Sequence, residues 1–426
     1  MAIQTIHEQA DVLVLGAGTA GAIATIQAAR AGARTVAIDR AAGMGGTTTI
    51  GGVNAVCSFH AYGKQVIAGI GWEMVEAACR LAGQSAESCT KPHPVDACTL
   101  VVVQPELLSL VEEEAALTAG ASLHYHEFPV SIEDHGGRWC VETIGHGPLR
   151  RIIETTELID CTGDAAAFAL LGLPLDRAPV RQPGTLIFSL DGYDPDALDG
   201  EEIQRRYNQA LADGRLAEGD FWRADKPFVQ FLHAHGRNAQ HVDQADSSTC
   251  VSQTAADLSG RQSLLRLLRF CRTLPGLEHL RLTDMRESTA VRETVRIVGR
   301  RCITEDDYVS GRIFDDAVCN AYWFVDVHTQ AGVEKRVLAE GDVPTVPHSA
   351  MLSPGIQRLQ AAGRCISSDR RANSALRIQA TCMATGQAAG AAAALGARLG
   401  VPSADVPIDQ IRQLLAENGA ILPQPC

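Results

Sequence analysis

A glycine-rich turn near the start of the chain constrains the fold more than any other feature of this sequence. Gly16, Gly18 and Gly21 form the pattern G-x-G-x-x-G within the stretch DVLVLGAGTAGAIATIQ. The first glycine allows a tight turn, the second lets a pyrophosphate approach the backbone, and the third lets a helix pack closely on a strand. This pattern alone is weak, because many glycine-rich loops contain it, so its surroundings decide its meaning.

The residues around the turn predict a complete β-turn-α-β unit. The apolar run at 12–15 is typical of a strand buried on both faces, residues 22–31 have helical character, and residues 35–38 predict a second strand. Asp39 closes that strand, where a carboxylate accepts hydrogen bonds from a ribose. The helix N-terminus offers free N–H groups and a positive dipole end to phosphates. We therefore expect a dinucleotide site, with NAD and FAD both open at this point.

Composition excludes several classes of protein. The 426 residues suffice for two domains, and a net charge of −13 argues against a nucleic-acid partner. No stretch reaches the roughly 18 apolar residues of a membrane helix, and the N-terminus lacks the basic region of a signal peptide. The 13 cysteines are scattered without a CxxC pair, which favours reduced thiols over disulfides or an iron–sulfur centre. We expect a cytoplasmic protein without a membrane partner.

Three further segments favour FAD over NAD. The stretch GMGGTTT at 43–49 predicts a small polar loop that runs along the pyrophosphate and the ribityl chain. The stretch IDCTGD at 159–164 predicts a strand followed by a turn that returns to the cofactor. The stretch DRRANSALRIQATCMATGQAAG at 369–390 has three arginines ahead of a helix of small residues. We expect that helix to begin at 381–384 with its N–H groups toward the flavin, and to pack tightly on the cofactor strand.

Together these segments resemble the glutathione-reductase-type flavoproteins, and within them the FAD-dependent oxidoreductase family related to fumarate reductase and succinate dehydrogenase flavoproteins. The resemblance covers most of the chain, including FHAYGKQVIAGIGWEMV, VRETVRIVGRRCIT, AAGRCISS and TCMATGQAAGAAAAL. It implies an α/β fold, with a three-layer, Rossmann-like FAD-binding domain built on a mostly parallel sheet and an inserted α+β substrate or cap domain. It also implies non-covalent FAD, because no histidine stands where some relatives attach the flavin.

The residues expected at the cofactor come from the glycine turn, the polar loop, the TGD turn and the last helix, with Val130 beside the adenine by the same resemblance. They are Gly16, Gly18, Thr19, Ala20, Gly21, Asp39, Arg40, Gly45, Gly46, Thr47, Thr48, Val130, Thr162, Gly163, Asp164, Gly363, Arg364, Thr381, Cys382, Met383 and Ala384.

The expected domains are discontinuous. Residues 1–175 and 345–400 form the FAD-binding domain, 176–344 the substrate or cap domain, and 401–426 a C-terminal helical tail. Within the insertion, 201–216 and 261–276 have helical periodicity, and AYWFVDVHT at 321–329 predicts a strand. An insertion that covers the flavin places the substrate between two domains, a common location for ligands.

His60 is the first candidate for catalysis. It lies one strand beyond the polar loop, and the resemblance puts it near the flavin ring. Histidine titrates near neutral pH and can remove a hydroxyl proton as hydride leaves. The alternative is a histidine that only caps a loop.

Three arginines are candidates for holding an anionic substrate group. Arg292 and Arg296 are four residues apart, so a helix or tight turn would put them on one side, and the alternative is an ordinary ion-paired face. Arg377 is the arginine of the 369–390 stretch that we place nearest the pocket, whereas Arg370 and Arg371 fit a surface equally well.

The remaining histidines have weaker signals. His348 precedes the returning cofactor strand, and a changed substrate pocket and a structural role are equally compatible with it. The segment FLHAHGRNAQH at 231–241 invites a metal interpretation, but no acid or cysteine follows at a convincing spacing. We therefore expect no metal, and a coincidence or a substrate-loop role there.

The combined expectation is an FAD enzyme that moves a hydride between flavin and a small polar molecule, such as an alcohol, polyol, sugar, hydroxy acid or amine. The electron acceptor is open, and a homo-oligomer is possible. The first alternative is reduction of an activated C=C bond, as in fumarate reductase relatives. The second is a flavin electron-transfer subunit without its own substrate, and a nicotinamide-only dehydrogenase is least favoured.

Overall fold

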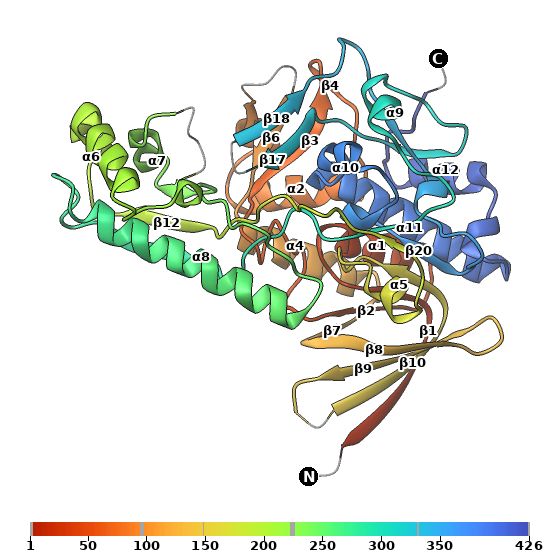
Figure 1. Cartoon of the computed structure of the whole chain (residues 1–426). Coiled ribbons are helices and arrows are strands. Elements are labelled where there is room, and N and C mark those ends of the chain that lie inside the picture. Colours follow the sequence, from red (N-terminus) through yellow and green to blue (C-terminus); the bar gives the residue numbers. More distant parts are fainter. Residues whose placement is uncertain (1–2, 94–97, 148, 222–225, 330–331, 425–426) are drawn as a thin grey trace.

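A mostly parallel sheet forms the centre of the protein, for which a computed structural model describes residues 3–93, 98–147, 149–221, 226–329 and 332–424. The strand order is β7-β2-β1-β10, and β20 pairs with the C-terminal end of β10 (Figure 1). All of these neighbours run parallel. Antiparallel β9 and β8 continue the sheet beside the N-terminal half of β10. The strands are β1 (Gln4–Leu15), β2 (Thr35–Asp39), β7 (Ser122–Tyr125), β8 (Glu127–Asp134), β9 (Trp139–Gly145), β10 (Leu149–Asp160) and β20 (Leu359–Ala361).

Strand β1 is buried on both faces, which confirms the prediction from its apolar run. Val12 and Val14 belong to the core that includes helices α1 (Thr19–Arg30) and α11 (Gln379–Leu399). Leu13 and Leu15 face the opposite core, which β8, β9 and α5 (Ala166–Leu170) complete. Successive side chains of a strand point to opposite faces, so one apolar run supplies both cores. The result is the predicted three-layer, Rossmann-like α/β fold.

Helix α11 contacts strands β1 and β10 of the cofactor sheet, but its glycines meet helix α1 instead of a strand. A Cβ on Gly386 would lie 2.1 Å from the carbonyl oxygen of Ala20, and one on Gly390 would lie 2.4 Å from that of Ala24. The two helix backbones therefore touch directly. Small residues at the crossing make this contact possible, and they account for the alanine- and glycine-rich sequence of α11.

Two smaller β-sheets and several further helices surround the ends of α1 and α11. An antiparallel sheet has the order β4-β3-β6-β5, and β17 pairs with β18 in a hairpin. These strands are β3 (Ala55–Ala61), β4 (Lys64–Gln65), β5 (Thr90–Pro92), β6 (Cys98–Val102), β17 (Val325–Thr329) and β18 (Gly332–Arg336). The helices here are α2 (Ile70–Leu81), α3 (Ala86–Cys89), α4 (Pro105–Thr118), α9 (Glu305–Val309) and α10 (Arg370–Leu376). Strands β16 (Ala317–Asn320) and β19 (Thr345–Pro347) pair beside α11, and β11 (Leu175–Asp176) pairs with β15 (Arg296–Ile297).

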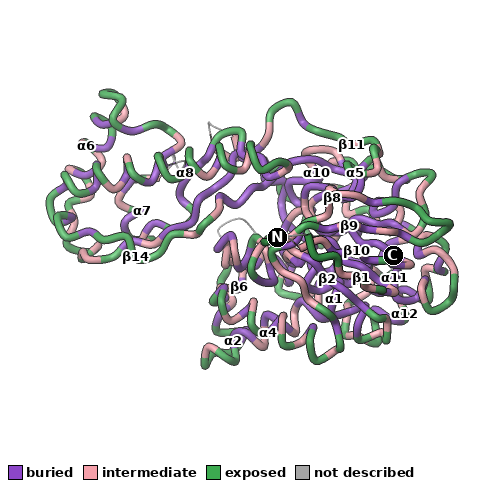
Figure 2. Tube along the Cα trace, turned by 90° about the horizontal axis from the view of Figure 1, so that it is seen from below, coloured by how far each residue is buried: buried purple, intermediate pink, exposed green. Residues whose placement is uncertain are grey.

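The insertion forms an arm that extends away from the main body (Figures 1 and 2). Its strands are β12 (Phe188–Asp191), β13 (Gly236–Arg237) and β14 (Arg281–Met285), and its helices are α6 (Gly200–Ala212), α7 (Val229–His233) and α8 (Cys250–Cys271). The arm has its own core, whose buried residues lie between Leu186 and Leu280. Residues 303–338 contribute to the main core instead. The independent core is thus narrower than the predicted 176–344 segment.

Helix and strand boundaries in the insertion differ from the periodicity-based expectation. Helix α8 begins at Cys250, eleven residues before the predicted 261. Its first half is polar and therefore shows no apolar periodicity. The side chain of its N-cap residue, Thr249, accepts a hydrogen bond from the Ser252 N–H and fixes the start of the helix. Strand β17 covers only the second half of the predicted 321–329 strand.

The segment after Val401 packs onto the main core. Its helix α12 (Ile408–Glu417) places Ile411, Leu414 and Leu415 in that core. Among the described residues, no helix is long and apolar enough to cross a membrane.

Candidate cofactor site and catalytic cluster

The glycine turn has the geometry that its sequence predicted. Gly16 adopts φ +87°, and a Cβ there would lie 2.8 Å from the Cα of Thr162. A Cβ on Gly21 would lie 1.7 Å from the carbonyl oxygen of Gly16, so strand and helix meet at this residue. Helix α1 begins at Thr19 with no side-chain cap on its first N–H groups. These groups remain available to a phosphate.

The polar loop lies directly against this turn. The Thr19 hydroxyl donates to the Gly45 carbonyl over 2.9 Å, and a Cβ on Gly46 would lie 2.7 Å from the Cα of Gly18. Thr48 is fully buried, and its hydroxyl oxygen has no hydrogen-bond partner. A buried hydroxyl normally has a partner, so a missing group is indicated at this loop.

Asp39 is fixed at the end of β2 by the backbone. Its two carboxylate oxygens accept bonds from the Ala17 N–H over 2.6 Å and from the Ala41 N–H over 2.7 Å. Burial raises the pKa of this carboxyl, an effect that the two backbone bonds oppose. Each oxygen keeps a second lone pair for a ribose hydroxyl.

The TGD turn is held by the acid that precedes it. Asp160 accepts the N–H and hydroxyl of Thr162 with one oxygen, over 3.0 and 2.7 Å, and the Ala167 N–H with the other over 2.8 Å. A Cβ on Gly163 would lie 2.8 Å from Arg364 Nε. Sequence analysis selected the turn but not the role of Asp160.

Asp164 joins the cofactor domain to the insertion. Its Oδ1 accepts bonds from Arg364 Nη2 over 2.8 Å, from the Ser247 hydroxyl over 2.7 Å and from the Thr294 hydroxyl over 3.0 Å. Arg40 lies 3.4 Å from its Oδ2. Three of the four charged side chains predicted for the cofactor, Arg40, Asp164 and Arg364, are therefore gathered at one place.

Helix α11 begins at Gln379, two residues before the predicted start. The Cys382 N–H already donates to the Ile378 carbonyl over 2.9 Å, so Cys382, Met383 and Ala384 belong to the helix interior. Only Thr381 of the four predicted residues keeps an N–H in the first turn. Its hydroxyl is buried and has no partner.

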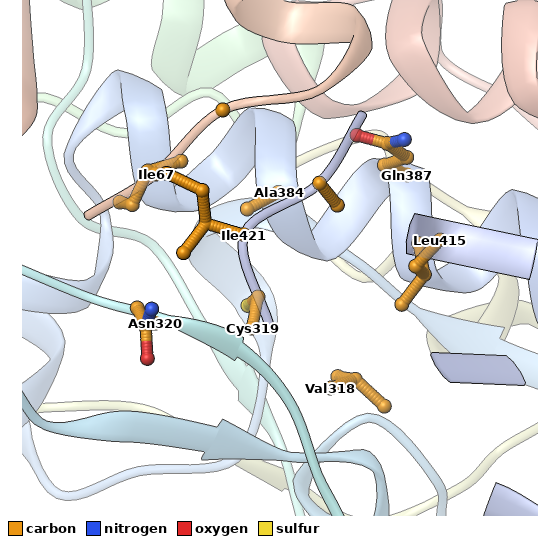
Figure 3. Close-up of a pocket in the computed structure, with 10 residues that line it drawn as sticks. Ile67, Val318, Cys319, Asn320, Ala384, Gln387, Leu415 and Ile421 are labelled. Carbon is orange, nitrogen blue, oxygen red and sulfur yellow. The ribbon is translucent and has the colours of Figure 1, made fainter. Parts of the chain in front are cut away.

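The opposite face of α11 is closed. In Figure 3, Ala384 and Gln387 lie beside Ile67 and Ile421 around a cavity of about 10 Å³. A space of this size holds at most one water molecule.

These features fit FAD. Two helix starts offer N–H groups, two buried hydroxyls lack partners, and glycines leave the space that side chains would fill. Val130 lies where the register between β8 and β9 shifts, so its backbone stands outside the regular ladder. Its contact with an adenine stays a prediction.

Next to the start of α11, a buried cluster of polar side chains joins the arm to the main body. His328 Nε2 lies 3.4 Å from Asp326 Oδ1, and His328 Nδ1 lies 3.0 Å from Nε2 of His241 in the arm. Arg377 Nη2 lies 3.6 Å from Asp326 Oδ2. Arg292 donates to the Pro183 carbonyl over 2.7 Å. Arg377 is the C-cap of α10, which places this cluster beside the first turn of α11.

Burial and charge keep both histidines neutral. Burial lowers the pKa of His328 to about 4, with Arg292 adding to the effect and Asp326 opposing it. Burial likewise lowers the pKa of His241 to about 2. Asp326 stays ionised, because its contacts with His328 and the two arginines outweigh its burial and hold its pKa well below the usual range. A neutral imidazole beside a carboxylate has the arrangement of a general base.

The sequence profile of the family described as FAD dependent oxidoreductase matches residues 11–415. The chain belongs to this family. The match spans both the cofactor domain and the arm, so FAD is the cofactor of this oxidoreductase. That the glycine turn contacts it stays a prediction. No match was found among curated proteins.

The solved structures with a similar fold share little sequence identity with this oxidoreductase. A geranylgeranyl bacteriochlorophyll reductase-like protein from Thermoplasma acidophilum shares 12% identity over 97% of this chain and 84% of its own, with a TM-score of 0.44. The anhydrotetracycline hydroxylase OxyS from Streptomyces rimosus shares 13% identity over 96% of this chain and 66% of its own, with a TM-score of 0.43. The p-nitrophenol 4-monooxygenase PnpA from Pseudomonas putida shares 12% identity over 97% of this chain and 85% of its own, with a TM-score of 0.41. At these values the likeness carries no information about the reaction.

The structure brings Arg292 and Arg377 of the oxidoreductase together, whereas Arg296 has other charged partners. Arg296 lies in β15, so the 292–296 segment is not the helix or tight turn that would pair the two arginines. Its guanidinium is bound by Glu293 over 3.2 Å and Asp176 over 2.5 Å. Arg370 and Arg371 also form ion pairs, with Glu293 and Glu305 respectively.

His348 and His60 have their own surroundings. The His348 ring is buried and contacts Gln360 over 3.3 Å, and Gln360 donates to the Ala389 carbonyl. Ala389 is ten residues into α11, about 15 Å from its start. The His60 ring packs on Trp72 with its Nδ1 buried and without a partner, and burial alone lowers its pKa.

The sequence patterns did not single out Asp326 and His328, and for His241 they favoured a coincidence or a substrate-loop role over a metal. Among the described residues, no group of three or more His, Cys, Asp and Glu side chains could hold a metal ion. The alternation of Asp326 and His328 in β17 was the available signal, since residues two apart share one face of a strand. Their partner His241 is 87 residues away in the sequence.

Proposed function

We propose that this oxidoreductase transfers a hydride between a small polar organic molecule and non-covalently bound FAD, and that the reaction takes place at the Asp326–His328–His241 cluster. The observation that carries the proposal is the buried chain of contacts from Asp326 to His241 beside the first turn of α11. Buried histidines with strongly lowered pKa values beside a carboxylate make this cluster a candidate functional site, because active sites gather such groups.

Bound FAD supplies the hydride acceptor. In the oxidation of an alcohol or amine, the substrate C–H bond breaks with both electrons, and the O–H or N–H proton goes to the histidine pair. Asp326 orients His328 and stabilises the positive charge that the pair then carries. The first turn of α11 stabilises negative charge that develops on the reduced cofactor.

Anaerobic reduction of the flavin tests this proposal. The holoenzyme is mixed with polyols, sugars, hydroxy acids and amines, and loss of the flavin absorption band is followed. With the best substrate, we expect His328→Gln and Asp326→Asn to slow reduction about 100-fold, within the range for a lost general base. His60→Ala is the matched comparison, because the sequence pattern favoured His60 as the base and its ring packs on Trp72.

Unchanged reduction rates in His328→Gln and Asp326→Asn, with His60→Ala inactive, would return the role of base to His60. A flavin that no small molecule reduces, but that exchanges electrons with a partner protein, would support the electron-transfer alternative.

The two buried arginines favour a second candidate, reduction of an activated C=C bond. Arg292 and Arg377 would polarise the acceptor, and one of them would donate the proton. Arginine variants would then lose turnover more than histidine variants, and an unsaturated acid would reoxidise the reduced flavin.

A further inference from the structure

We propose that Arg292, Arg377 and Gln182 form a subsite for a carboxylate group of the substrate. This inference rests on the proposed function, because it specifies the substrate class at the same cluster. Its ligand is a small organic acid whose carboxylate lies between the arm and the start of α11.

The first argument is the balance of charge. Arg292 is buried, with 9% of its surface exposed, and no carboxylate of the described residues lies within ion-pair distance of it. Its bonds go to neutral acceptors, the Pro183 carbonyl over 2.7 Å and the Asn238 side chain over 3.4 Å. Arg377 is also largely buried, and its one close carboxylate is Asp326 at 3.6 Å. Two buried guanidinium groups therefore share one carboxylate.

Nearby acids do not correct this imbalance. Glu293 is held by Arg296 at 3.2 Å on one oxygen, and its other oxygen contacts Arg370 at 3.3 Å and the Gln182 N–H at 3.2 Å. The two histidines are neutral. Burial and the repulsion from Arg377 lower the pKa of Arg292 to about 9. The Arg292 guanidinium is therefore charged at neutral pH and is repelled by the guanidinium of Arg377. An added anion relieves this repulsion.

The second argument is a set of donors without acceptors. Gln182 is fully buried and its amide Nε2 has no partner, and Nε of Arg377 is buried without a partner as well. The Gln182 side chain is already fixed, because its Oε1 accepts bonds from Arg377 Nη2 over 3.3 Å and the His328 N–H over 3.1 Å. Unpaired buried donors are costly, and a carboxylate supplies acceptors for both of them at once.

The two arginines come from different parts of the fold, which gives the subsite a second property. Arg292 is tied to the arm through Pro183 and Asn238, whereas Arg377 belongs to the main body. A carboxylate between them bridges the two units. The remaining alternative acceptor for these donors is a flavin carbonyl oxygen, and binding experiments separate the two cases.

Holoenzyme titrated with acetate and, separately, with acetamide tests the subsite. These probes have nearly the same shape and differ in charge, and the change in the flavin absorption spectrum reports binding. We expect acetate to perturb the spectrum with saturation and acetamide to bind about 10-fold more weakly or worse, since a hydrogen bond to a charged group is stronger than a neutral one. Arg377→Gln and Arg292→Gln should each weaken acetate binding at least about 10-fold with FAD content unchanged.

Arg370→Gln is the matched control, because Arg370 lies in the same 369–390 stretch but pairs with Glu293. The Arg370→Gln variant should bind acetate as the unmodified enzyme does. Arg377→Lys keeps the charge and serves if Arg377→Gln fails to fold. Equal binding of acetate and acetamide would overturn the subsite, as would loss of FAD in place of acetate binding in the arginine variants. Arginine-dependent acetate binding without flavin reduction by any small molecule would keep the subsite and refute the proposed reaction.

Discussion

Replacing Gly386 by alanine tests how closely helices α1 and α11 must approach. The added Cβ would lie 2.1 Å from the carbonyl oxygen of Ala20 and 2.8 Å from its carbonyl carbon. The two backbones would have to separate by about 1 Å to reach an ordinary contact, and neither contains a side chain that can rotate away. Overpacking of a core costs about 1–3 kcal/mol, and alanine regains about 1 kcal/mol of helix propensity. Because backbone meets backbone, we take the upper end and expect a loss of about 2 kcal/mol in the free energy of unfolding.

The same movement shifts the starts of both helices, so FAD affinity should fall with stability. Urea unfolding of the apoprotein gives the first quantity, and a fluorescence titration with FAD gives the second. We expect about tenfold weaker FAD binding, equivalent to about 1.4 kcal/mol.

Gly260→Ala is the control, because it is also a buried helical glycine, but its Cβ would meet only side-chain atoms at 3.1–3.3 Å. A Gly386→Ala protein within about 0.5 kcal/mol of the unmodified one, the range of a neutral surface change, would refute the reasoning.

Two further predictions concern Asp39 and the histidine cluster. Asp39→Ala removes the acceptor of the Ala17 and Ala41 N–H groups as well as the ribose acceptor, so FAD affinity by titration should fall at least about 10-fold, whereas Asp176→Ala should leave it unchanged. His328 is neutral when folded, with a pKa lowered from 6.5 to about 4, so the unfolded chain binds more protons between these values and stability falls as pH drops from 6.5 to 4. The loss due to this group approaches about 3 kcal/mol, and urea unfolding of His328→Gln should show a shallower pH dependence by up to one proton. An unchanged slope would mean that His328 titrates normally.

Local patterns were sufficient to predict the β-turn-α-β unit at the start of the chain. The glycine turn, the strand before it and Asp39 lie within 30 residues, and each has a distinct steric reason that the sequence displays. Helix α11 begins two residues before the predicted start. The sequence did not show this, because the N-cap residue, Ile378, has no side chain that can cap a helix. Helix α10 was missed because its seven residues are too few to show periodicity.

The proposed catalytic half was not predictable, because contacts across long sequence distances build it. Arg292 lies near Arg377, whereas Arg296, the residue with which the sequence grouped it, is held by Glu293 and Asp176. Asp326 and His328 lie in a strand whose apolar residues gave the stronger signal. Their significance depends on His241, which only the docking of the arm brings to them.

The contact between α1 and α11 also fixes the relative direction of the two helices. Gly386 meets Ala20, and Gly390 meets Ala24, so a step of four residues along one helix matches a step of four along the other. The helices are therefore parallel, and α11 begins about six residues, or about 9 Å, ahead of the level at which α1 begins. Parallel dipoles in contact repel each other. We expect the negative charge of bound FAD to offset this repulsion, so the apoprotein should be less stable than the holoprotein at this end of the sheet.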